Sequence, residues 1–422
     1  MKTVIMADRA LDGLGGVLEK AALLIEGTRI LGLARQAEMG QIDGARVVEA
    51  PPGATIMPGL IDAHVHLAYS GATGAGRMQA EAMDQSFPEV ALRAAARARD
   101  SLIHGLTALR DMAAPGGAVI DLAAAIAAGD VVGPRVVACG RGLTVTGGHM
   151  DRPTPDHVAM PGARATCDGA DGFRKGVRVE ARRGAAFIKI NSCVSSHKRT
   201  GIWWRPEMSP EEIRAACDEA HTQDMIVAAH TSGGPPLTTS VENGVDCVEH
   251  AHWIDDDCIE LMAKRGTFLV PTLLVNERTF EVPLTQQGIA RISDWSAAAR
   301  EAKWVSLEKA RGAGLRVGAG TDAGFMLPHA TMFWRELTLL VDGGYSQGEA
   351  IVAATSVNAD ILGIEAGRLE AGRLADLVIV TGNPLTDLSV LGDASRLEVW
   401  KDGMQVAFGG RLVTPWPQEA RA

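Results

Sequence analysis

Two histidines stand at the end of an apolar run, Ile56 to Leu67, near the start of the sequence. His64 and His66 are two positions apart, and residues i and i+2 of a β-strand project from the same face. Both imidazoles could therefore bind one metal ion without distortion of the backbone. Two such histidines can also lie on a hydrated strand, so the pair alone leaves both interpretations open.

Four further polar residues end later apolar runs in the same way. They are Lys189 in FIKI, His230 in AAHT, His250 in VEH and Asp322 in GTD. Each has a structural alternative, because a lysine can form an ion pair, a histidine can be hydrogen-bonded in the core and an aspartate can cap a turn. Six such coincidences would be rare, and imidazoles with a carboxylate suit a divalent cation such as zinc.

Apolar runs alternate with alanine-rich helical segments through the middle of the chain, which is typical of βα units and a parallel sheet. The predicted strands are 56–67, 106–112, 135–139, 187–191, 226–230, 247–250, 268–273 and 316–322. The predicted helices include 88–105, 118–129, 209–223 and 294–314. Eight strands with interleaved helices favour a closed (β/α)8, or TIM, barrel over an open sheet. The strand ends of such a barrel meet at one mouth, where the six polar residues would converge.

The two ends of the chain have a different pattern, with short strands and turns. We expect residues 1–55 and 367–422 to form a small composite β-sandwich domain, and residues 56–366 to form the barrel. The overall fold class is therefore α/β, with one small all-β unit built from both termini.

Composition excludes several classes of protein. Of the 422 residues 46% are hydrophobic, and the net charge of −10 without a dense basic run argues against nucleic acid or a membrane surface as a partner. The six cysteines form no Cys-x-x-Cys pair, which predicts reduced thiols. The start lacks a signal-peptide core and no segment could span a bilayer, so we expect a cytoplasmic chain. An exported form whose leader precedes residue 1 stays open.

Taken together, the motifs resemble the amidohydrolase superfamily of binuclear metal hydrolases over nearly the whole chain. The matching segments are MPGLIDAHVH, FIKI, AAHT, VEH, GTD and GRLEAGRLADLVIVTGNPL. Within that superfamily the chain is most similar to the branch of prolidase-like dipeptidases and ochratoxin-hydrolysing amidohydrolases. The segments that indicate this branch are GLTALRD, TGGH, PHATMFWREL and AATSVNADILG.

The resemblance implies two divalent metal ions, with zinc as the expected metal. The implied ligands are His64, His66 and Asp322 for one ion, and His230 and His250 for the other. Lys189, carboxylated by carbon dioxide, would bridge both ions together with a hydroxide. A carbamate is an anionic oxygen ligand, whereas a lysine ammonium has no lone pair. Asp322 would accept the proton of the attacking water and pass it to the departing amine.

Other residues are implied on the substrate side of the centre. His149 is a candidate catalytic residue that would hold the carbonyl or carboxylate of the substrate, and His329 would line the mouth. Ser70 is a further substrate-binding candidate. His252 could support the ligands or replace His250 as one of them. Structural roles for these histidines remain open.

The segment after Lys189 departs from the Gly-rich loop that is usual in this branch. Trp203 and Trp204 stand beside Arg205, so an aromatic surface and a cation would be adjacent. Such a pair suits an aromatic substrate with a free carboxylate. A contact between the subunits of a homo-oligomer, which we also expect, is the alternative role.

The resemblance thus predicts a carboxypeptidase-like or prolidase-like enzyme that cleaves the amide between an acyl group and a C-terminal amino acid. Its substrate would be a small amide or dipeptide with a free carboxylate, including ochratoxin A, which would give ochratoxin alpha and phenylalanine. A cyclic amidohydrolase acting on lactams or imidazolones is the alternative enzyme. A catalytically silent barrel scaffold is the third hypothesis, although such scaffolds typically lose metal ligands.

Overall fold

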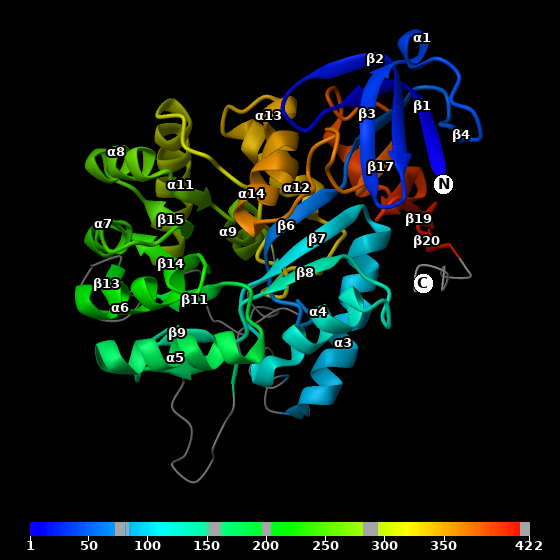
Figure 1. Cartoon of the computed structure of the whole chain (residues 1–422). Coiled ribbons are helices and arrows are strands. Elements are labelled where there is room, and N and C mark those ends of the chain that lie inside the picture. Colours follow the sequence, from blue (N-terminus) through cyan, green and yellow to red (C-terminus); the bar gives the residue numbers. More distant parts are fainter. Residues whose placement is uncertain are drawn as a thin grey trace.

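The computed structural model describes residues 1–71, 81, 84–149, 151, 162–195, 204–281 and 294–413. Figure 1 shows helices around a group of strands in the middle of the chain, and a second sheet where the two termini meet. Among the described residues, every helix is too short or too polar to cross a membrane.

The central strands form two parallel groups. One group has the order β6 (Leu60–Val65), β7 (Leu106–Asp111) and β8 (Arg135–Ala138). The other has the order β10 (Arg164–Thr166), β9 (Gly142–Thr144), β11 (Ile188–Asn191), β14 (Val227–Gly233), β15 (Cys247–Trp253) and β16 (Phe268–Val270). Seven of the eight predicted runs therefore contain a central strand.

Backbone hydrogen bonds join the two groups into a ring, as a TIM barrel requires. Ala186 N donates to Ala138 O at 2.9 Å, between β8 and the start of β11. On the other side, residues 316–323 bridge β16 and β6, where Leu269 pairs with Val317 and Val65 pairs with Ala323. This eighth segment makes isolated bridges and is not the regular strand that the sequence predicts.

Two glycines explain where the strands depart from the predicted runs. The first run, 56–67, is divided at Gly59, where a Cβ would lie 2.1 Å from the Thr107 hydroxyl. The part before Gly59 is β5 (Ala54–Pro58), which pairs with the terminal sheet, and the part after it is β6. In the eighth segment a Cβ at Gly320 would lie 2.8 Å from that of His64. Only glycine allows this close approach to β6.

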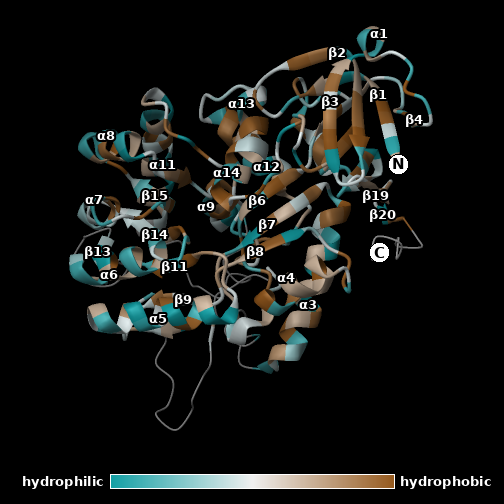
Figure 2. Ribbon diagram, viewed as in Figure 1, coloured by the Kyte–Doolittle hydropathy of each residue, from teal (hydrophilic) through white to brown (hydrophobic). Residues whose placement is uncertain are grey.

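The predicted helices are present with similar bounds: α3 (Phe87–Ile103), α4 (Ala118–Ala127), α6 (Pro210–His221) and α11 (Asp294–Gly312). The others named below are α5 (Gly169–Arg183), α7 (Pro235–Glu242), α9 (Leu273–Glu281), α12 (Phe333–Asp342), α13 (Gln347–Val352) and α14 (Asn358–Leu362). Ser209 begins α6 with a capping box, because its side chain bonds the Glu212 amide and the Glu212 side chain returns the bond. Figure 2 shows largely hydrophilic helices α5 and α6 outside more hydrophobic strands.

Strands from both ends of the chain belong to one nine-stranded sheet, visible as blue and red arrows in Figure 1. Its order is β20 (Arg411–Leu412), β19 (Met404–Phe408), β18 (Leu397–Lys401), β17 (Leu377–Thr381), β5, β1 (Lys2–Leu11), β2 (Val17–Glu26) and β3 (Arg29–Arg35), with β4 (Arg46–Glu49) beside β1. Ile5, Ile56 and Trp400 lie in a separate core of this sheet. Its packing as a sandwich, and the boundaries at residues 55 and 367, stay predictions.

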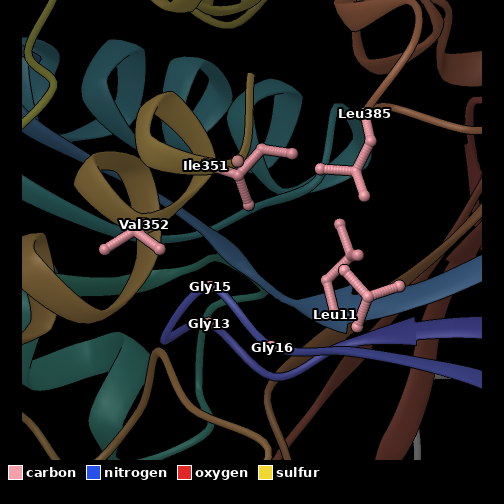
Figure 3. A pocket seen from close by; sticks show the side chains of 9 residues that line it. Leu11, Gly13, Gly15, Gly16, Ile351, Val352 and Leu385 are labelled. Carbon is pink, nitrogen blue, oxygen red and sulfur yellow. The ribbon is translucent and has the colours of Figure 1, made fainter. Parts of the chain in front are cut away.

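A small hollow lies where the β1–β2 turn faces α13 (Figure 3). Its lining residues are Leu11, Gly13, Gly15, Gly16, Val17, Gly348, Ile351, Val352 and Leu385. None of these residues, all of which the structure describes, carries a titratable side chain. The hollow therefore offers packing between the terminal sheet and the helices but no chemistry.

Asn358 closes the seam between β6 and the eighth segment, and its loss should destabilise the barrel. Its Nδ2 donates to Ile61 O at 2.6 Å and to Ala319 O at 2.7 Å, and its Oδ1 accepts from Ala319 N at 3.1 Å. We expect Asn358→Ala to lower the free energy of unfolding by about 2–4 kcal/mol, measured by urea titration, because buried backbone groups lose their partners. Asn358→Asp keeps the size but loses both donors, so it should be comparably damaging. An Asn358→Asp protein as stable as the wild type would contradict this role.

Candidate metal centre

The carboxyl ends of several barrel segments bring the predicted metal ligands together. His66 Nε2 lies 3.2 Å and His64 Nε2 lies 3.5 Å from Asp322 Oδ1. Ligand atoms of His64, His250 and Asp322 all lie within 4.8 Å of one another, and all three residues are buried. A divalent cation could be bound by this arrangement without movement of the backbone.

His230 and Lys189 extend this cluster along β14 and β11. The His230 and His250 rings meet edge to face, with centroids 4.6 Å apart. Lys189 is 2% exposed, and its charge acts on the pKa of His64, His230 and Asp322. The structure thus gathers all six residues that the strand-end pattern singles out.

Several nitrogens of this cluster lack a hydrogen-bond partner, which indicates whether the residues could bind metal ions. Among the described residues, His66 Nδ1, Lys189 Nζ and His230 Nε2 are buried without a hydrogen-bond partner. Such groups are costly unless something binds them. Burial lowers the pKa of His64 to about 4 and that of Lys189 to about 8. Neutral imidazoles offer lone pairs, so the donor set fits divalent cations.

A fully buried ion pair contacts His64 at Nδ1, the ring nitrogen that does not face Asp322. Arg110 Nη2 donates to Glu249 Oε1 at 2.6 Å, and Glu249 Oε2 lies 2.7 Å from His64 Nδ1. Burial raises the pKa of Glu249, but Arg110 and His64 lower it by more, so the carboxylate is ionised. It accepts a hydrogen bond from Nδ1–H of His64, which leaves the Nε2 lone pair directed at the centre.

Sequence reasoning missed Arg110 and Glu249 as parts of the site, although both stand inside motifs that carry the resemblance. The available signal was a charged residue within an apolar strand run, GLTALRD for one and CVEHA for the other. A fully buried charge needs a partner, and these two residues are partners across the barrel.

His250 and Asp322 have strained backbones, with φ of 71° and 61°. Thr272, which also has a positive φ of 48°, places its Oγ1 2.8 Å from His250 Nδ1. Non-glycine residues in this left-handed region often occur at functional sites, where the surrounding structure holds them in place.

His149 lies beside the cluster, because its ring stacks on that of His230 with centroids 4.0 Å apart. Its backbone amide donates to Glu207 Oε2 at 2.8 Å. Burial and then the charge of Arg164 lower the pKa of His149 to about 3. The ring of His252 is stacked 6.3 Å from that of His250 on the same strand, so it lies at the edge of the cluster.

Two other predicted substrate residues, His329 and Ser70, are hydrogen-bonded to groups outside the metal cluster. His329 is buried and its Nε2 lies 2.9 Å from Tyr69 O, which gives it a structural hydrogen bond. The Ser70 amide donates to Glu81 Oε2 at 3.0 Å.

Trp204 belongs to β13 (Trp204–Pro206), and its ring lies 5.7 Å from that of Trp253, at the end of β15. The Arg205 side chain is 62% exposed. Trp203 lies outside the described residues.

Comparison with known proteins places this geometry in a family. The model of the amidohydrolase family matches residues 55–406. Ochratoxinase of Aspergillus niger is 29% identical, over 99% of this chain and 89% of its own. Its crystal structure superimposes with a TM-score of 0.86, 28% identity, and coverage of 100% of this chain and 98% of that one.

Two further relatives carry the names of other amidohydrolases. A Xaa-Pro dipeptidase crystallised with methionine in its active site has a TM-score of 0.83 and 29% identity, and the match covers 96% of this chain and 99% of that one. Imidazolonepropionase of Rhizorhabdus wittichii is 27% identical, over 89% of this chain and 91% of its own. These similarities give the chain a TIM barrel with an additional domain and small-molecule substrates. The chain belongs to the amidohydrolase family, and it is an enzyme that acts on amide bonds.

Proposed function

We propose that this enzyme is a binuclear metal-dependent hydrolase of amides that link an acyl group to a C-terminal amino acid. His64, His66 and Asp322 would hold one ion, and His230 and His250 the other, with a carbamate on Lys189 between them. Zinc is the metal that this donor set suits best. When bound, the ions lower the pKa of a water molecule and polarise the substrate carbonyl.

The chain's own residues supply the proton transfers and the carbamate. Asp322 would accept a proton from the attacking water and give it to the departing amine nitrogen. Burial raises the pKa of Asp322, but His64 and His66 lower it by more, so it begins as the base. A pKa of about 8 gives Lys189 a neutral fraction at neutral pH, and only that fraction can attack carbon dioxide.

The substrate assignment depends on Arg164, a cation without a carboxylate partner among the described residues. It stands opposite Gly142 in the β9–β10 pair, and a Cβ at Gly142 would lie 3.0 Å from its Nη1. The next residue, Leu143, projects to the other face, where a Cβ at Gly176 of α5 would lie 3.3 Å from it. Side chains alternate along a strand, so Arg164 lies on the face away from α5, towards the barrel interior.

Within the described part of the chain, no hydrogen bond or ion pair joins Arg164 to a carboxylate. Nη1 donates only to Ala163 O at 3.3 Å, and within the described part of the chain Nε is buried without a partner. Its charge is the strongest electrostatic influence on His149, which stacks on His230. An arginine in this state is suited to bind a carboxylate through two hydrogen bonds. We assign it to the free carboxylate of the substrate.

We also propose that the enzyme prefers substrates with an aromatic C-terminal amino acid. Trp204 and Trp253 form a tilted pair 5.7 Å apart, next to His252, whose ring lies 5.6 Å from that of Trp253. This surface could accept an aromatic leaving amino acid such as the phenylalanine of ochratoxin A. Because the Arg205 side chain is largely exposed, we favour Arg164 as the cation.

The alternative enzyme is a cyclic amidohydrolase, which the similarity to imidazolonepropionase supports. A lactam without a carboxylate would leave Arg164 unpaired, so the acyl amino acid is favoured. The silent-scaffold hypothesis is weaker, because all six residues with ligand chemistry are present.

Removal of Lys189 should weaken metal binding in a protein that still folds. We expect Lys189→Ala to lose at least one of two zinc ions per chain, measured by elemental analysis, and to lose most activity. A short carboxylic acid such as propionate should restore part of both, because it supplies the missing bridging oxygens. Full metal content and activity in Lys189→Ala without added acid would contradict the carbamate.

Removal of Arg164 should affect only substrates that carry a carboxylate. A charged hydrogen bond contributes about 1.5–3 kcal/mol, so Arg164→Met should lower kcat/KM for N-acyl amino acids roughly 10- to 150-fold. The same substrates with a C-terminal carboxamide should show little further loss, and Arg205→Met serves as the matched control. Equal losses on both substrate series would exclude Arg164 as the carboxylate anchor, and a preference for lactams would favour the cyclic amidohydrolase.

A further inference from the structure

Helix α11 carries a buried lysine, Lys303, that is hydrogen-bonded to the backbone near the metal centre. Lys303 is 3% exposed, and its Nζ donates to Thr272 O at 3.0 Å. One turn later, Ser306 Oγ donates to His252 O at 2.9 Å. The same face of α11 therefore contacts the residues that follow β16 and those that end β15. Burial lowers the pKa of Lys303, because a buried ammonium group loses its hydration. An apolar side chain at this position would pack without that free-energy cost.

Helix α12 places a buried glutamate next to the same turn. Glu336 is fully buried, and its two carboxylate oxygens accept from Leu273 N at 2.9 Å and from Leu274 N at 2.7 Å. These are the first amides of α9, and Thr272 immediately precedes them. Lys303 thus holds the carbonyl of the Thr272 turn while Glu336 holds the two amides that follow it.

The turn between them has a conformation that needs such support. Thr272 is β-branched and has φ of 48°, in the left-handed region that such residues rarely adopt. In this conformation Thr272 Oγ1 lies 2.8 Å from His250 Nδ1. Donation from Nδ1–H to this oxygen would leave the Nε2 lone pair of His250 for a metal ion.

We propose that Lys303 and Glu336 are positioning residues, which hold Thr272 in its strained conformation so that its hydroxyl fixes the ring and tautomer of His250. The inference rests on the proposed function, because its consequence is for the ion that His250 would bind. Among the described residues, neither side chain forms a hydrogen bond or ion pair with a predicted ligand. They act through the turn, as Arg110 acts on His64 through Glu249.

The test is a zinc titration of the full chain in competition with a chromophoric chelator. Residues that orient a metal-binding histidine typically contribute 10- to 100-fold to affinity. We expect Lys303→Met, Glu336→Gln and Thr272→Val each to weaken binding of one zinc ion by about that factor and to leave the other nearly unchanged. Thr272→Ser, which keeps the hydroxyl, should bind both ions like the wild type. Excess zinc should restore activity to the three weakened variants.

Lys309→Met is the matched control, because Lys309 lies on the same helix in an exposed ion pair with Asp256 at 2.8 Å. It should leave both affinities unchanged. If Lys303→Met or Glu336→Gln fails to fold, the comparison of Thr272→Val with Thr272→Ser still decides. Two wild-type affinities in the folded variants would overturn the positioning role and leave the proposed function intact. A wild-type chain that binds no zinc would overturn the proposed function, and this inference with it.

Discussion

Glu249 accepts hydrogen bonds from Arg110 and from His64 in the fully buried interior of the barrel. Arg110 also donates from Nε to Ala63 O at 2.6 Å, so this one network ties β7 to β6 and β15. Removing either charge would leave the other buried and unpaired, at a cost of about 3–5 kcal/mol. The orientation of His64, and with it the approach of Asp322, depends on this ion pair.

Other predicted ligands at the mouth of the barrel are also fixed by a neighbouring group, but the kind of group differs. His64 is held by a carboxylate, His250 by a hydroxyl and Asp322 by its backbone, whose amide donates to His64 O at 2.8 Å. Each support comes from a different part of the barrel, so the predicted ligands are placed by the barrel as a whole. Among the described residues, Lys189 Nζ and Arg164 Nε are buried without a hydrogen-bond partner, and we assign them to the carbamate and to the substrate carboxylate.

Much of the candidate metal centre could be predicted, because the sequence pattern indicates both where the strands are and which polar residues lie at their ends. Apolar runs reveal the strands, and the polar residue that ends each run then lies at the mouth, as for His230 and Lys189. The supports could not be predicted in this way, because nothing in the local pattern says that Arg110 and Glu249, or Lys303 and Glu336, meet across the barrel. The division of the first run at Gly59 and the irregular eighth segment reflect close approaches of glycines, which depend on neighbours distant in sequence. Arg164 was missed because a lone arginine in a short strand has no periodic signal.

We propose that two metal ions bind among these six side chains with a carbamate on Lys189. Crystals grown with zinc and bicarbonate, with anomalous scattering recorded at the zinc edge, test it most directly. We expect two zinc peaks, one beside His64, His66 and Asp322 and one beside His230 and His250, with additional density beyond Lys189 Nζ. A single peak with an unmodified lysine, or zinc bound away from these residues, would contradict it.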